Sequence, residues 1–138
     1  MKVLIEDEQI LIGLEHLEYY PYYFCSWAEE DDHRLVVKNV LSQWASALAK
    51  LNGELVAVFL PYYLDDESCR VLKAVLKGED IVFTNLVIWE NAYALDLDNL
   101  EEFMVTEPHI IESSPREFGR YNRQEIISAL NNAEVVGA

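Results

Sequence analysis

Two tyrosine-rich segments, each followed by a cluster of acidic residues, contain the residue types in this chain best suited to binding chemistry. Both include a Pro-Tyr-Tyr-apolar string, at residues 21–24 and 61–64, and two more tyrosines precede the first string. Tyrosine rings supply rigid contact area, while carboxylates attract Lys and Arg and accelerate encounter. We therefore predict a partner-binding surface made of Tyr19, Tyr20, Tyr22, Tyr23, Tyr62, Tyr63, Glu29, Glu30, Asp31, Asp32, Asp65, Asp66 and Glu67.

A structural role is the alternative explanation for the same residues. The acids can cap the helices expected to follow them, and the tyrosines can pack their rings on the core with their hydroxyls in water. For each cluster taken alone this is the simpler interpretation. Over the whole chain, however, 25 Asp and Glu stand against 10 Lys and Arg, a net charge of −15. A small soluble domain needs a net charge of only about 2 to 8 in magnitude, so the excess favours binding to a cationic partner.

Sequence motifs for catalysis, metal binding and nucleotide binding are missing or incomplete. Glu30-x-x-His33 has the spacing of ligands in di-iron bundles, but those sites need a second such pair and two more carboxylates. Cys25 and Cys69 form no Cys-x-x-Cys pair and have no recognisable activating base. The five glycines form no phosphate-binding loop. We therefore assign no catalytic residue, no metal ligand and no cofactor.

Composition predicts one compact domain spanning residues 1–138. The chain is 51% hydrophobic, enough to offset the entropy of folding despite its charge. Its first acid, Glu6, comes too early for a secretory signal. The longest nearly apolar run, at 55–64, contains Pro61 and is shorter than the ~18 to 20 residues of a membrane span. We expect a soluble cytoplasmic protein with reduced thiols and no membrane contact.

Hydrophobic spacing predicts the elements that must position the tyrosines and acids. Residues 3–5 and 10–12 are typical of two strands joined in a hairpin. Apolar residues at helical spacing predict a helix from about 33 to 51, with Asp31 or Asp32 as its cap. The nearly unbroken apolar run at 54–60 predicts a strand covered on both faces.

A second helix is predicted over residues 65–77, because acids open it, lysines close it and Gly78 follows. With strands at 54–60 and 81–89 on either side, it would form a right-handed parallel crossover. Strand ends that lead into helices line one edge of such a sheet, so the two tyrosine segments should lie side by side.

Weaker signals follow in the C-terminal third. They predict a strand at 93–97, a helix from 98 to about 104, a helical turn after Ser114 and a helix from Asn122 to about Asn131. The fold class is therefore α/β or α+β: a single domain with a mixed sheet of about four to six strands, three or four helices and one β-α-β crossover.

The leading functional hypothesis is a small acidic binding protein that masks a basic partner, such as an inhibitor or immunity protein for a nuclease or toxin. Direct contact with nucleic acid is disfavoured, because Arg116, Arg120 and Arg123 form too small a basic face. One alternative is a metal-dependent, hydrolase-like enzyme in which carboxylates, His33 and Tyr22 line a pocket. Another is a subunit of a larger assembly that uses the tyrosines as its contact.

Overall fold

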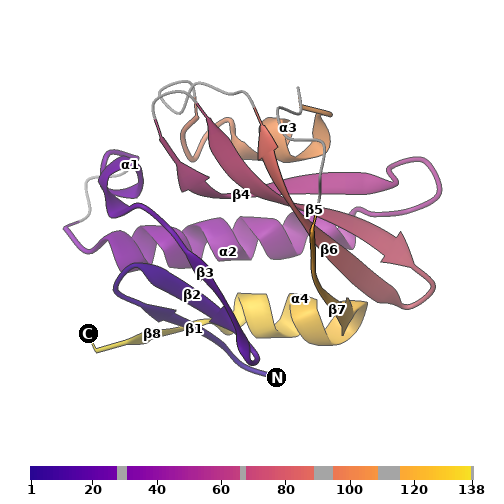
Figure 1. The fold of residues 1–138 in the computed structure, drawn as a ribbon, viewed down its shortest axis with the longest axis horizontal. Coiled ribbons are helices and arrows are strands. Elements are labelled where there is room, and N and C mark those ends of the chain that lie inside the picture. The colour runs from indigo at the N-terminus through magenta and orange to yellow at the C-terminus, as the bar shows by residue number, and fades with distance from the viewer. Residues whose placement is uncertain (28–30, 66–67, 89–94, 109–115, 138) are drawn as a thin grey trace.

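The structure of the protein, a computed structural model, describes residues 1–27, 31–65, 68–88, 95–108 and 116–137 (Figure 1). These residues form eight strands and four helices. In chain order they are β1 (Val3–Glu6), β2 (Gln9–Ile12), β3 (Glu15–Glu18), α1 (Pro21–Cys25), α2 (His33–Ala49), β4 (Ala57–Leu64), β5 (Cys69–Lys77), β6 (Asp80–Ile88), α3 (Leu100–Val105), β7 (Arg116–Asn122), α4 (Arg123–Asn131) and β8 (Glu134–Val136).

The strands form two four-stranded sheets. One has the order β3-β2-β1-β8, in which β8 pairs with β1 in parallel and the other pairs are antiparallel. The other has the order β4-β5-β6-β7 and is antiparallel throughout. The edge strands β3 and β4 contact one another, so the two sheets adjoin. The α+β class predicted from the sequence is confirmed, with more strands than expected.

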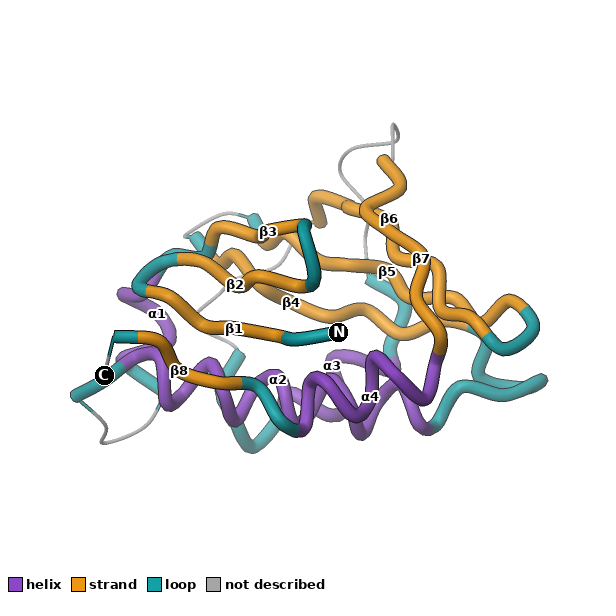
Figure 2. Tube along the Cα trace, turned by 90° about the horizontal axis from the view of Figure 1, so that it is seen from below, coloured by secondary structure: helices purple, strands orange, loops and turns teal. Residues whose placement is uncertain are grey.

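Helix α2 connects the two sheets through a shared core. The helices lie along one side of the molecule and most of the strands on the other, with β8 beside α2 (Figure 2). Helix α2 contacts β1, β8 and β4 as well as the other three helices. Its Trp44 is fully buried in a continuous apolar cluster to which both sheets contribute. None of the described helices is both long and apolar enough to cross a membrane.

Several predicted elements are confirmed. The β1–β2 hairpin pairs Val3 with Ile12, and α2 begins one residue after Asp32, whose side chain accepts a hydrogen bond from the backbone N–H of Arg34. Helix α4 is capped by Asn122, whose side chain accepts from the N–H of Glu125. Helix α3 also lies where a short helix was predicted.

The helix predicted over 65–77, and with it the parallel crossover, is wrong. Residues 69–77 are strand β5, which pairs antiparallel with both β4 and β6. Lys77 pairs with Asp80, so Gly78 and Glu79 form a two-residue hairpin turn. Gly78 has φ +65°, a conformation that ends helices and also closes tight hairpins. Gly78 was predicted to follow the end of a helix but instead lies in a hairpin turn, because the segment before it pairs with strands on both sides.

The helical turn predicted after Ser114 is also wrong in the part that the structure describes, because Arg116 and Glu117 begin strand β7 and pair with β6. Residues 95–97 are not a strand, and the first two residues of the strand predicted at 93–97 lie outside the described residues. Strands β3 and β8 and helix α1 were not predicted. All three have five residues or fewer, too few to show a period.

The hairpin turn at Gly78 gives a direct test of this topology. An alanine Cβ at Gly78 would meet nothing within 4 Å, and the same holds at Gly53, but only Gly78 of the two has positive φ. We expect Gly78→Ala to lower the free energy of unfolding by about 1–2 kcal/mol, and Gly53→Ala to change it little or raise it by about 0.4–1 kcal/mol. Urea denaturation of both variants makes the comparison. Equal effects would show that the turn does not require the left-handed conformation.

Candidate functional site

Three tyrosines from the two predicted segments stack on one another at the surface. The rings of Tyr22 and Tyr20 have centroids 6.2 Å apart at 27°, and those of Tyr20 and Tyr63 are 6.4 Å apart at 25°. Both are offset-stacked arrangements. Tyr22 is 61% exposed and Tyr20 46% exposed, while Tyr63 is half-buried. We call Tyr20, Tyr22 and Tyr63 the tyrosine stack.

A β-bulge and a short helix place these rings together. In β4 the register shifts between Pro61 and Tyr63, so Tyr62 is the extra residue and Tyr63 pairs with Arg70 of β5. The guanidinium carbon of Arg70 lies over the Tyr63 ring, 4.7 Å from its centroid. Tyr20 is the residue before α1, and Pro21 begins that helix with a φ already suited to it. The two segments therefore do meet, although the second leads into a hairpin and not into a helix.

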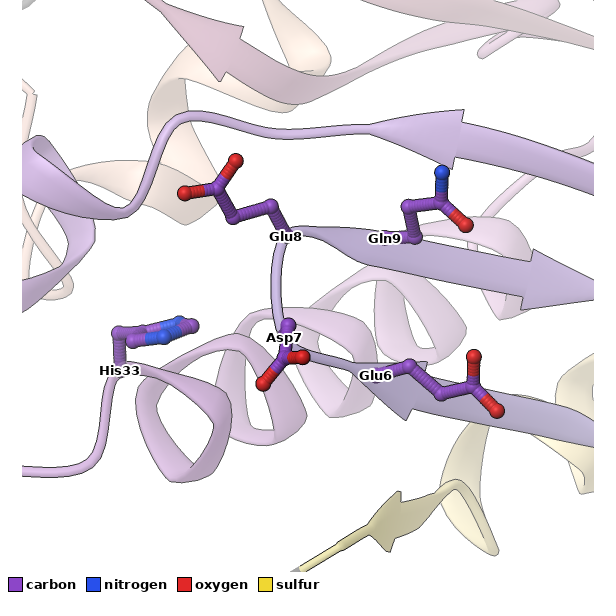
Figure 3. Close-up of a pocket in the computed structure, with 5 residues that line it drawn as sticks. All are labelled: Glu6, Asp7, Glu8, Gln9 and His33. Atoms are coloured by element: carbon purple, nitrogen blue, oxygen red, sulfur yellow. The ribbon is translucent and has the colours of Figure 1, made fainter.

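The turn between β1 and β2 provides an acidic surface next to the segment that contains Tyr19 and Tyr20. Glu6, Asp7 and Glu8, which we call the acidic turn, line an open depression of about 540 Å³ with Gln9 and His33 (Figure 3). Asp7 and Glu8 are exposed. The figure shows the three carboxylates spread around the turn and pointing in different directions. The turn therefore presents a distributed negative surface and not a single chelating point.

Tyr19 joins the acidic turn to the start of α2 and to the tyrosine stack. Its hydroxyl donates a hydrogen bond to the backbone carbonyl of Asp7, and its N–H donates to the carbonyl of Glu8. Its hydroxyl oxygen also lies 2.8 Å from Nδ1 of His33. The Tyr19 hydroxyl has one proton, and it donates that proton in the hydrogen bond to the carbonyl of Asp7. In the bond between the hydroxyl and His33, Nδ1 of His33 must therefore be the donor. Burial raises the pKa of the Tyr19 hydroxyl well above its ordinary value, so it remains a donor.

Half of the tyrosines predicted to face a partner are buried instead. Tyr19, Tyr23 and Tyr62 are at most 7% exposed. The hydroxyl of Tyr62 donates to Oδ1 of Asn85 at 2.6 Å, and burial raises its pKa to about 12. Tyr23 packs edge-on against Tyr22, with ring centroids 5.1 Å apart. Tyr23 therefore supports the exposed rings from below, since it also contacts Tyr20 edge-on.

The predicted acids divide into structural and exposed groups. Asp32 caps α2 and binds the Arg34 guanidinium, and Asp65 accepts hydrogen bonds from Ser68 that close the β4–β5 turn. The capping role considered for the acids is therefore confirmed for Asp32, whereas Asp65 precedes strand β5 and caps no helix. Asp31 is exposed. Four others lie outside the described residues: Glu29, Glu30, Asp66 and Glu67.

Sequence reasoning treated residues 6–9 only as a polar turn and missed their place in the site. The signal was present, because three consecutive acids in a hairpin turn exceed what a turn needs. Their nearness to Tyr19 comes from the pairing of β2 with β3, a strand that was not predicted. The position of Arg70 opposite Tyr63 depends on the β4 bulge, which has no sequence signature here.

The enzyme alternative places carboxylates, His33 and Tyr22 in one pocket. His33 and carboxylates do share a depression, but Tyr22 belongs to the stack and is not among its lining residues. Within the described part of the chain, no three His, Cys, Asp or Glu side chains are grouped so that they could hold a metal ion.

The chain matches no protein-family model, and comparisons with curated proteins and with solved structures find no match either.

The Asp32–Arg34 pair should shape the acid limb of the stability curve. Hydrogen bonds from the Arg34 side chain, and then from its backbone, hold the pKa of Asp32 below its ordinary value. Because the folded-state pKa is lowered, this stabilisation is present above an ordinary Asp pKa of about 3.9 and is lost as pH falls through the folded value. Asp32→Asn should keep the cap but flatten the fall in unfolding free energy below about pH 4.

Arg34→Gln is the matched variant, since it removes the other partner of the same pair. We expect it to flatten the acid limb similarly, and the double variant to add nothing further. Urea denaturation at a series of acidic pH values measures this. Additive effects of the two substitutions would contradict a shared interaction.

The Tyr19 hydroxyl should contribute to stability by anchoring the acidic turn. Tyr19→Phe leaves the buried ring in place but removes the partner of both Asp7 and His33. We expect a loss of about 1–3 kcal/mol in the free energy of unfolding. Tyr22→Phe removes an exposed hydroxyl from a neighbouring ring and should cost less than about 0.5 kcal/mol. Equal losses in chemical denaturation would contradict the anchoring role.

Proposed function

We propose that this chain is an acidic cytoplasmic binding protein that masks a basic partner, acting as an inhibitor or immunity protein for a nuclease or toxin. The observation that carries the proposal is the exposed tyrosine stack, whose Tyr20 directly follows the residue that is hydrogen-bonded to the acidic turn. Tyr19 ties the turn to the chain segment that enters the stack. Aromatic anchors next to carboxylates suit a partner rich in Lys and Arg.

Charge supports the same conclusion. A net charge of −15 on 138 residues gives the molecule a net negative potential, which raises the local concentration of cationic proteins and repels nucleic acid. The acidic turn makes no ion pair among the described residues, whose salt bridges join Arg34 to Asp32, Lys50 to Glu101 and Arg120 to Asp80. Its carboxylates are therefore available to an incoming cation.

The mechanism of masking follows from the chemistry of the proposed partner. A nuclease holds phosphate groups with Lys and Arg, and carboxylates of the acidic turn would pair with those same side chains. The tyrosine stack would supply the contact area from which water is excluded. Nucleic acid would then be kept away by competition for the cations and by the negative charge of the bound protein.

The test compares two triple variants of equal net charge. Glu6→Gln, Asp7→Asn and Glu8→Gln neutralise the acidic turn. The control triple, Glu54→Gln, Glu79→Gln and Glu107→Gln, neutralises exposed acids outside the site. The partner is captured from cell extract on the immobilised wild-type protein, and its association rate is measured for each protein at low and physiological salt.

We expect the acidic-turn variant to associate roughly tenfold more slowly at low salt, and the control variant to stay close to wild type. Thermal unfolding of both variants verifies that they fold. Equal association rates for the two triples, or capture only of acidic and neutral proteins, would contradict the proposal.

A further inference from the structure

The tyrosine stack already holds one guanidinium from its own chain. Arg70 lies over the ring of Tyr63 at 4.7 Å from the centroid, in the geometry of a cation–π contact. Arg70 is exposed and is fixed opposite Tyr63 by the pairing of β5 with β4. The contact shows that the ring face of Tyr63 accepts a guanidinium.

The other two rings continue the same arrangement into solvent. Tyr20 stacks on Tyr63, Tyr22 stacks on Tyr20, and exposure rises along the series to 61% at Tyr22. Tyr23 supports both outer rings edge-on, with centroids 6.1 Å from Tyr20 and 5.1 Å from Tyr22. Two nearly parallel, supported rings form a rigid shelf for a flat cationic group.

Charge selects the occupant of this shelf. A second copy of the chain would bring another net charge of −15 to the same place, and an anionic ligand would meet the same repulsion. A cation is attracted, and a planar guanidinium stacks on an aromatic face better than a compact, strongly hydrated ammonium.

We propose that the tyrosine stack is a receptor for arginine side chains, and that it gives the protein a preference for arginine over lysine in its basic partner. A guanidinium of the partner stacks on Tyr22, the outermost ring, as Arg70 does on Tyr63, while the acidic turn attracts positive charge of either kind. This inference rests on the proposed function and adds to it the identity of the side chain that the partner inserts.

The experiment uses two fluorescent peptides of equal length and charge, one of alternating Arg and Ser and one of alternating Lys and Ser. Dissociation constants are measured by anisotropy at physiological salt. We expect the wild-type protein to bind the Arg peptide about two- to fivefold more tightly than the Lys peptide. Tyr20→Phe with Tyr22→Phe keeps the rings and should keep this ratio.

Tyr20→Leu with Tyr22→Leu keeps apolar volume without the aromatic faces, and should bring the ratio close to one. Leu14→Ala, at a fully exposed apolar residue in another turn, is the control for loss of surface hydrophobicity and should leave the ratio unchanged. The acidic-turn triple should weaken both peptides by the same factor and preserve the ratio.

The outcomes separate the two proposals. Equal affinities of the wild-type protein for both peptides, or an Arg preference that survives in the double Leu variant, would overturn the arginine receptor and leave a general cation-binding surface. Failure to bind either peptide would overturn the proposed function together with this inference.

Discussion

The packing of α2 against both sheets is the interaction on which the rest of the structure depends. Each sheet has only four strands, and together they share one apolar cluster with the helix. Trp44 lies in it fully buried, although its indole N–H has no hydrogen-bond partner among the described residues. Burying an indole of this size contributes roughly 4–6 kcal/mol, more than the about 1–3 kcal/mol that an unmet donor costs. At the centre of the molecule, the free energy gained by burying the indole therefore exceeds the cost of leaving its N–H without a partner among the described residues.

The site is attached to this core through its buried tyrosines. Tyr19 and Tyr23 belong to the core cluster, while the residues beside them in sequence, Tyr20 and Tyr22, face outward. Tyr19 also fixes the backbone of the acidic turn and contacts His33 at the start of α2. One short segment thus holds both the aromatic and the acidic parts of the proposed surface in place before any partner arrives, which reduces the ordering cost of binding.

The elements predicted correctly from the sequence are those whose residue patterns fit only one type of structure. Helix α2 has a long apolar period and a cap at Asp32, and the cap at Asn122 fixes the start of α4. Strand β5 was predicted as a helix because its apolar residues fit a helical stripe as well as a strand buried between two neighbouring strands. These residues are Val71, Leu72, Val75 and Leu76. The acids at the start of the segment and the lysines near its end also favoured a helix. Only the pairing with β4 and β6 distinguishes the two structures, and pairing is a property of the whole fold.

The types of residue in the candidate site could be predicted from the sequence, but the directions in which their side chains point could not. The tyrosine segments could be recognised in the sequence, but their meeting was predicted from a parallel crossover that does not exist. Burial of Tyr62 and partial exposure of Tyr63 accompany a bulge in β4. The most direct test of the account is a map of backbone amide chemical-shift changes when the captured basic partner binds. The account predicts the largest changes at residues 6–8, 19–23 and 63–70. Changes confined to the outer face of α2 and to α4, with none at the tyrosine stack, would contradict it.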